Sequence, residues 1–356
     1  MKKNWFDSKI KEFSLIGGYE KPELNENSLK LDSNENYVLS KQFQNDIVSA
    51  ARKNSDVREY PLGRINELIK MISKFSKVPA SMIGVGNGSD QILDLILSHF
   101  ASKNTKVLTS NPTFGFFEER CKLYSIPLIT IPFSDDMKLD IKEFEKRSKD
   151  ADILYLDSPN NPTGFTFTKN QLQKFVQSFD GLVIIDEAYG EFADYSLTKM
   201  VKTQDNLIVV RTLSKSFGLA GLRLGYFVAN KKFAEVFMNV LQYPYPLSTI
   251  TIESGILALE KVDLMYDAAD LIKSERKRII ENLRKYDAFE VFDSKANFVL
   301  FDAFDSYKRV YSALAEQGIS IRKLGKIGNH TGCLRVTIGT KEMNSKFLLA
   351  IRDLLG

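Results

Sequence analysis

The chain has 356 residues, enough for about two domains of ordinary size. Positive and negative residues nearly cancel, 49 Lys and Arg against 45 Asp and Glu, and the hydrophobic fraction of 44% is that of a soluble globular protein. A net charge of +4 on a chain of this size gives no basic patch, so nucleic acid is not expected as a partner.

The few cysteines and histidines exclude further classes of protein. Cys121 and Cys333 lie far apart, and His99 and His330 are the only histidines, so neither a disulfide framework nor a histidine-rich metal centre is expected. The longest uncharged run, 17 residues over 236–252, holds two prolines, and the N-terminus lacks the apolar core of a signal sequence. We therefore expect a cytoplasmic protein without a membrane partner or a bound metal.

The middle of the chain alternates short, β-branched apolar runs with helical patterns. Such runs suit strands buried on both faces, and the rhythm is typical of an α/β domain with a mostly parallel central sheet flanked by helices. In chain order we expect a helix over 89–101, strands over 106–109, 128–132 and 153–156, a helix over 168–178, strands over 182–185, 207–210 and 225–229, and a helix over 231–241.

The pattern changes after about residue 253. A long charged helix over 266–285 precedes an apolar run at 296–301, a helix near 306–317, a strand at 333–338 and a final helix from residue 341. These elements predict a smaller α+β domain. We therefore expect a large domain, residues 30–255, and a second unit made of an N-terminal arm, residues 1–29, and residues 256–356.

The first of four chemically informative segments is glycine-rich. Residues 84–90 read Gly-Val-Gly-Asn-Gly-Ser-Asp and precede a helix. Glycines let the backbone come close to an anion, and the amides at the start of a helix favour phosphate. A simple N-cap turn explains the same residues equally well. The spacing is not that of a dinucleotide-binding fingerprint.

The next two segments follow expected strands, at the sheet edge where α/β proteins bind ligands. Residues 157–164, Asp-Ser-Pro-Asn-Asn-Pro-Thr-Gly, form a rigid loop in which Asn161 can hydrogen-bond a ring substituent. Residues 182–189 end in Asp186-Glu-Ala-Tyr189. A carboxylate at the end of an apolar strand needs a partner, which is either a nearby Arg or Lys or a protonated ring nitrogen.

The fourth segment, residues 211–226, reads RTLSKSFGLAGLRLGY, and its Lys215 follows a strand end. A lysine held in a dry site loses affinity for its proton and can form a Schiff base with a carbonyl group. The four segments thus offer a phosphate cradle, an acid for a ring nitrogen, a phenol and an amide for a ring oxygen, and a reactive amine. Together they suit pyridoxal 5′-phosphate.

On these residues the chain resembles the pyridoxal-phosphate aminotransferases of fold type I, and among them the histidinol-phosphate aminotransferases. The resemblance spans nearly the whole chain and includes SPNNPTG, DEAY, RTLSKSFGLAGLRLGY, PYPLST and LRVTIGT. It implies that Lys215 holds the cofactor, that Asp186 pairs with the ring nitrogen, and that Asn161 and Tyr189 contact the ring oxygen. The other cofactor-binding residues that it implies are Gly88, Ser89, Asp90, Thr212, Ser214 and Arg223 around the phosphate and Phe114 stacked on the ring.

The resemblance also implies a homodimer with shared active sites, in which Tyr60 reaches the cofactor phosphate of the neighbouring subunit. Arg335 matches the arginine that takes the α-carboxylate of the amino donor, and Arg322 matches one used for phosphorylated substrates. Family members often read Asn-Glu-Asn-Pro near the substrate, with Gly-Pro soon after. Here Asn34-Glu-Asn36 continues with Tyr-Val-Leu-Ser. We expect Asn36 to bind substrate, and the altered loop leaves the substrate's identity open.

The implied function is transfer of an amino group between glutamate or 2-oxoglutarate and a small phosphorylated amine or ketone, as in amino-acid biosynthesis. L-histidinol phosphate and imidazole acetol phosphate are the first candidates. Two alternatives keep the cofactor: an aminotransferase for dihydroxyacetone phosphate (serinol phosphate) in surface-polysaccharide synthesis, and a decarboxylase of a phosphorylated amino acid. The sensor domain of a transcription regulator would need an added DNA-binding segment, for which the arm before Lys30 is too short.

Overall fold

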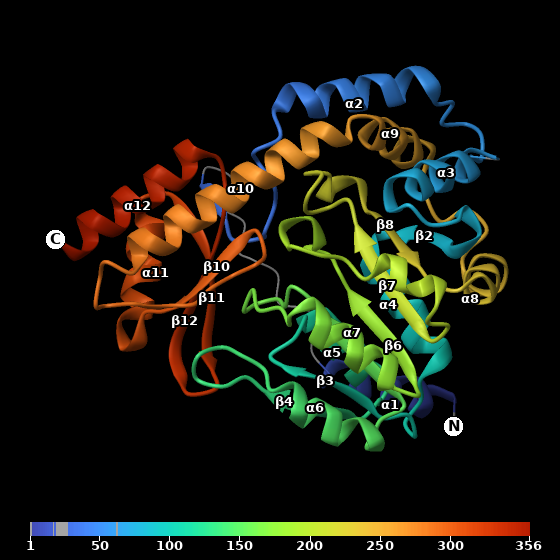
Figure 1. The fold of residues 1–356 in the computed structure, drawn as a ribbon, viewed down its shortest axis with the longest axis horizontal. Coiled ribbons are helices and arrows are strands. Elements are labelled where there is room, and N and C mark those ends of the chain that lie inside the picture. Colours follow the sequence, from blue (N-terminus) through green and yellow to red (C-terminus); the bar gives the residue numbers. More distant parts are fainter. Residues whose placement is uncertain (1, 17, 19–27, 62) are drawn as a thin grey trace.

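The chain forms two sheets that lie side by side, and a long helix, α10 (Val262–Leu283), runs from one to the other (Figure 1). The structure is a computed structural model, and it describes every residue except 1, 17, 19–27 and 62. In the described part of the chain, no helix is both long and apolar enough to cross a membrane.

The larger sheet has seven strands in the order β2-β8-β7-β6-β5-β3-β4. Strands β3 to β7 are parallel to one another, and β8 runs antiparallel to both of its neighbours. This confirms the mostly parallel α/β sheet and the six strands expected in it. The bounds are β2 (Ile83–Asn87), β3 (Val107–Asn111), β4 (Leu128–Pro132), β5 (Ile153–Asp157), β6 (Leu182–Asp186), β7 (Leu207–Thr212) and β8 (Leu224–Val228).

Alternating side chains of the central strands pack against helices on opposite faces of this sheet. On β5, Leu154 belongs to the hydrophobic cluster that includes Phe175 of α7, whereas Tyr155 belongs to the one that includes Phe117 of α5. Both faces are therefore covered, as the β-branched runs predict. The helices around this sheet are α2 (Lys41–Asn54), α3 (Arg64–Ser76), α4 (Gly88–Phe100), α5 (Gly115–Leu123), α6 (Ile141–Arg147), α7 (Lys169–Ser178), α8 (Lys231–Val236) and α9 (Thr249–Glu260).

Two expectations for the large sheet were wrong in detail. Gly84 and Gly86 lie inside strand β2, not in an anion-binding loop, and a Cβ on Gly84 would come within 2.2 Å of the Phe227 ring. Glycine is needed there for packing between strand and ring. The helix expected over 231–241 ends at Val236, and Phe237–Leu241 form a π-helical turn.

The smaller sheet has the order β1-β11-β12-β10-β9 and carries helices α10, α11 and α12, which confirms the second α+β unit. Its strand β11 was not expected as a strand, because polar residues and Gly325 interrupt any apolar alternation. The bounds are β1 (Leu29–Leu31), β9 (Glu290–Val291), β10 (Phe298–Asp302), β11 (Ile319–Ile327), β12 (His330–Thr337), α11 (Tyr307–Glu316) and α12 (Lys341–Leu355).

The N-terminal residues join the smaller sheet. Strand β1 pairs in parallel with β11, Leu29 opposite Ile319, so the expected domain boundary at residue 30 falls inside a strand. The division into 30–255 and the remainder stays a prediction. Of the expected arm, Lys2–Ser14 form helix α1, and most of the residues between α1 and β1 lie outside the described part.

Candidate active site

A cavity of about 450 Å³ opens at the carboxyl ends of the parallel strands and reaches the smaller sheet. This is the edge where open α/β sheets bind ligands. Residues from both halves of the chain line the cavity. Those expected from the sequence are Ser89, Asp90, Phe114, Asn161, Asp186, Tyr189, Thr212, Ser214, Lys215, Arg223, Arg322 and Arg335.

Lys215 lies in the loop after β7 and points its amine into this cavity. Its Nζ donates a hydrogen bond to the backbone oxygen of Ser33 (3.1 Å) and lies 5.8 Å from the centre of the Tyr189 ring. Burial, with a further contribution from the positive charge of Arg335, lowers the pKa of Lys215 to about 8. A larger fraction of the amine is therefore unprotonated and nucleophilic near neutral pH than for an exposed lysine.

Asp186 is the last residue of β6 and is almost completely buried. Its Oδ1 accepts a hydrogen bond from the backbone N–H of Ala188 (2.9 Å), and its Oδ2 accepts one from the Tyr155 hydroxyl (3.2 Å). Burial first, and then the negative charge of Asp157, raise the pKa of Asp186 to about 7. A positive partner in the cavity would favour its charged form.

Asp157, at the end of β5, ties two cavity loops together. One oxygen accepts hydrogen bonds from Thr113 and Asn160 (both 2.9 Å), and the other accepts one from the backbone N–H of Asn161 (2.7 Å). Thr113 precedes Phe114, so the aromatic side chain and the amide expected to contact one ring are positioned by a single carboxylate. Burial raises the pKa of Asp157 to about 6.

The start of helix α4 is suited to hold an anion. Asn87 makes no side-chain cap to the first amides of this 13-residue helix, so these amides are available to a ligand, and Ser89 and Asp90 line the cavity beside them. Gly88 has a φ of 79°, and a Cβ there would lie 2.5 Å from Nη2 of Arg223. A Cβ on Gly225 would lie 2.3 Å from the backbone N of Ser89. Both glycines therefore permit the close approach of helix, strand and guanidinium.

Arg223 and two hydroxyl groups complete this end of the cavity. Arg223 donates from Nη2 to Asp90 (2.9 Å) and from Nη1 to the hydroxyl of Ser214 (3.4 Å). The Thr212 hydroxyl accepts a hydrogen bond from the backbone N–H of Ser214 (3.1 Å), which holds both hydroxyls at the end of β7. Helix amides, a guanidinium and hydroxyl donors form a set that suits phosphate.

The segment after β1 contacts the site, but through Asn34 and not through Asn36. Asn34 is buried and donates from Nδ2 to the Tyr189 hydroxyl (2.8 Å). Asn36 is not among the described residues that line the cavity. Its Nδ2 donates to the backbone oxygen of Ser216 (2.7 Å), and its Oδ1 accepts from the backbone N–H of Val38 (2.9 Å). Asn36 thus ties this segment to the loop that carries Lys215, whereas Asn34 lines the cavity. A substrate contact by Asn36 stays a prediction that this geometry does not favour.

Two arginines of the smaller sheet face the same cavity. Arg322 on β11 and Arg335 on β12 are direct cross-strand partners. Arg335 is buried and donates to Oδ1 of Asn161 and to the backbone oxygen of Asp32. Two guanidinium groups on one side of a cavity are suited to anionic groups of a ligand.

Tyr60 lies apart from this cavity. Its side chain is 68% exposed and its ring stacks on that of Tyr245, with centroids 4.1 Å apart. Within its own chain, therefore, Tyr60 does not reach the residues expected to hold phosphate.

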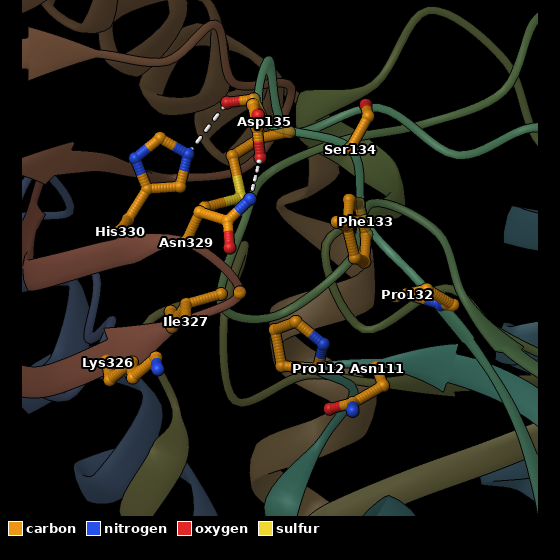
Figure 2. Close-up of a pocket in the computed structure, with 12 residues that line it drawn as sticks. Asn111, Pro112, Pro132, Phe133, Ser134, Asp135, Lys326, Ile327, Asn329 and His330 are labelled. Atoms are coloured by element: carbon orange, nitrogen blue, oxygen red, sulfur yellow. Dashed lines mark hydrogen bonds between the residues drawn. The ribbon is translucent and has the colours of Figure 1, made fainter.

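A second cavity, of about 340 Å³, lies between the loop after β4 and the turn that joins β11 to β12 (Figure 2). Asn329 Nδ2 donates to Oδ1 of Asp135 (2.9 Å), and Nε2 of His330 lies 2.7 Å from the backbone oxygen of Asp135. The residues expected to act chemically lie elsewhere. Across the described residues, no group of three His, Cys, Asp or Glu side chains is placed to hold a metal ion.

Residues 24–351 match the family model of the class I and II aminotransferases. The chain belongs to this family. It is a pyridoxal 5′-phosphate-dependent aminotransferase, and relatives support a likeness to the histidinol-phosphate enzymes. It is 34% identical over 331 residues to the histidinol-phosphate aminotransferase of Thermoanaerobacter sp. (strain X514), covering 92% of this chain and 93% of that one.

Two solved structures show how widely this aminotransferase fold is shared. The histidinol-phosphate aminotransferase of Clostridium acetobutylicum superposes with a TM-score of 0.82 and 28% identity, covering 91% of this chain and 98% of that one. The L-threonine-O-3-phosphate decarboxylase of Porphyromonas gingivalis superposes with a TM-score of 0.76 at 22% identity, covering 90% and 99%. The fold alone therefore does not separate transfer from decarboxylation.

The aminotransferase site fits its cofactor. The approach of α4 to Arg223 and β8 would be blocked by a Cβ at Gly88 or Gly225, and the uncapped amides there suit a phosphate. Asp186 suits a protonated ring nitrogen, and Lys215 suits a carbonyl carbon. Several lining residues were not predicted, among them Asp32, Ser33 and Phe116. These three carry no sequence signal of chemistry, because two of them contribute through their backbone oxygens.

Proposed function

We propose that this aminotransferase moves an amino group between glutamate or 2-oxoglutarate and a small phosphorylated amine or ketone. The first candidates are L-histidinol phosphate and imidazole acetol phosphate. The observation that carries the proposal is the pair of arginines, Arg322 and Arg335, which face the cavity from adjacent strands. A forked guanidinium binds phosphate and carboxylate alike, so one site can serve both glutamate and an amine without a carboxylate.

The proposed roles of the protein groups follow from their positions. When bound, pyridoxal phosphate supplies a ring that takes up the electron pair left on the substrate carbon after that carbon loses a proton. Lys215 Nζ would bind the cofactor's carbonyl carbon and later carry the proton to and from the substrate carbon. The Asp186 carboxylate would hold the proton on the ring nitrogen. Asn161 and Tyr189 would hold the ring oxygen, and Phe114 would cover the ring face.

We also propose that the enzyme is a cytoplasmic homodimer with shared sites. Tyr60 and Tyr245 form a stacked pair of large aromatic side chains that remain 68% and 45% exposed in the single chain. Contact with a second subunit would cover them and bring the Tyr60 hydroxyl toward the neighbour's cofactor phosphate. Cys121 and Cys333 are both free thiols, which agrees with a reducing compartment.

The substrate is tested by assaying histidinol phosphate, histidinol, serinol phosphate and phosphoserine side by side with 2-oxoglutarate as acceptor. A site built to pair a phosphate rejects the free alcohol, because its donors are then left unmatched. We expect histidinol phosphate to react far faster than histidinol. Turnover of serinol phosphate with inert histidinol phosphate would instead support the polysaccharide alternative. Release of carbon dioxide from phosphoserine would support a decarboxylase.

A further inference from the structure

The phenol of Tyr155 is a buried polar group that the proposed function leaves unused. Tyr155 lies on β5, two residues before Asp157 and opposite Ile184 of β6. Its side chain is completely buried and its hydroxyl donates to Oδ2 of Asp186 at 3.2 Å. Tyr155 is not among the described residues that line the cavity, and its ring packs in the hydrophobic cluster that contains Phe117.

The position of this phenol is tightly determined. Its ring stacks face to face on Phe117, with centroids 3.5 Å apart and an interplanar angle of 7°. Burial and the nearby carboxylates of Asp186 and Asp157 raise the pKa of Tyr155 well above its ordinary value, so its hydroxyl keeps its proton. A fixed hydroxyl that keeps its proton acts as a permanent donor to Asp186.

Among the described residues, Oδ1 of Asp186 accepts a hydrogen bond from Ala188 and Oδ2 accepts one from Tyr155. A carboxylate oxygen has two acceptor directions, so each oxygen can still accept one from a ligand. The two donors hold the carboxylate plane in place and stabilise its charged form against burial. A carboxylate that lost the Oδ2 donor would be free to turn and easier to protonate.

We propose that Tyr155 is a positioning residue that holds the Asp186 carboxylate, charged and correctly oriented, toward the ring nitrogen of the cofactor. The inference rests on the proposed role of Asp186. It predicts that removing one hydroxyl, outside the cavity, weakens specifically the contact between Asp186 and that nitrogen.

The test compares binding of two ligands to apoprotein: pyridoxal phosphate, and its carbocyclic analogue in which a C–H group replaces the ring nitrogen. The ratio of their dissociation constants measures what the nitrogen contributes. The wild type should prefer the natural cofactor, Asp186→Asn should lose most of that preference, and Tyr155→Phe, which keeps the ring stack, should reduce it about tenfold. Tyr226→Phe is the matched control, because it removes another buried hydroxyl, one with no hydrogen-bond partner among the described residues.

The outcomes separate the two proposals. If Asp186→Asn loses the preference and Tyr155→Phe keeps it in full, the positioning role is overturned while the role of Asp186 stands. If Asp186→Asn also keeps the preference, the proposed role of Asp186 fails, and that of Tyr155 fails with it. An equal reduction in Tyr226→Phe would show a general effect of buried hydroxyls and would also overturn the inference. Thermal unfolding of each apoprotein shows whether the variants are folded.

Discussion

Arg322 and Arg335 lie directly opposite each other on the antiparallel strands β11 and β12, and both line the cavity that holds Lys215. Like charges in this cross-strand relationship repel and cost free energy of folding. An anion between or beside them relieves that repulsion. The pairing therefore places two guanidinium groups side by side where an anionic ligand can contact both.

Lys215 should carry the cofactor. Lys215 is the one lysine among the described residues that line the cavity, and its lowered pKa favours reaction with a carbonyl group. We expect the purified protein to be yellow, and borohydride reduction to fix the cofactor on the peptide that contains Lys215. Peptide mass spectrometry checks the position, with Lys215→Ala as the control that should take no label. Label on another lysine would contradict the assignment.

The stability of the apoprotein should fall as pH rises, because of Asp186. Folding raises the pKa of this carboxyl from 3.8 to about 7, so the folded state holds the proton more tightly than the unfolded state. The resulting stabilisation is complete below the unfolded pKa and is lost as pH rises through about 7. Urea unfolding across this range should show the free energy of unfolding decreasing, with a smaller decrease in Asp186→Asn. Identical slopes in the two proteins would refute this account.

Most of the larger sheet could be predicted because its strands are short, apolar and regularly alternate with helices. Strand β11 escaped prediction for a physical reason. Its apolar alternation is limited to Ile319 and Ile321, because Arg322, Lys323 and Lys326 face a cavity or solvent and interrupt it. Strand β2 escaped because its glycines suggested a loop, whereas they make room for the ring of Phe227 and its neighbours.

The residues expected to contact the cofactor were easier to predict than the residues that hold them in place. Lys215, Asp186 and Asn161 follow strands in compact motifs, so sequence spacing alone brings them to one edge of the sheet. The choice between Asn34 and Asn36 could not be made in this way. It depends on which amide faces Tyr189 and which faces Ser216, and contacts between residues more than 150 positions apart decide that.

Tyr60 should act on the neighbouring subunit's site. Mixing Tyr60→Phe subunits with Lys215→Ala subunits gives some heterodimer sites in which both residues are wild type. We expect activity to recover partly on mixing, up to about a quarter of the wild-type sites if subunits pair at random and each site uses one residue from each chain. Native mass spectrometry confirms that heterodimers form. If they form and activity does not recover, Tyr60 acts within its own chain or has no role at the site.

Arg322 should determine the preference for phosphorylated substrates. Each hydrogen bond to a charged group is worth about 1.5–3 kcal/mol, so losing this guanidinium should lower kcat/KM for histidinol phosphate by about 10- to 100-fold. Histidinol lacks the phosphate, so its kcat/KM should fall much less. The ratio of kcat/KM for histidinol phosphate to that for histidinol should therefore fall by a similar factor. Arg322→Lys keeps the positive charge but loses the forked pair of donors. Its kcat/KM for histidinol phosphate should therefore lie between the values for the wild type and for Arg322→Ala.

The amino-donor half of the reaction separates Arg322 from Arg335. Arg335 is buried against Asn161 and the backbone of Asp32, and we assign it the α-carboxylate of glutamate. Arg335→Ala should therefore slow single-turnover reaction with glutamate more than Arg322→Ala does, because it removes the carboxylate anchor and leaves the Asn161 amide without its donor. Absorbance changes of the bound cofactor follow each half-reaction separately. Equal losses with both substrates in both variants would mean that the two arginines act as one undivided anion site, and phosphate selectivity would then have to come from elsewhere in the cavity.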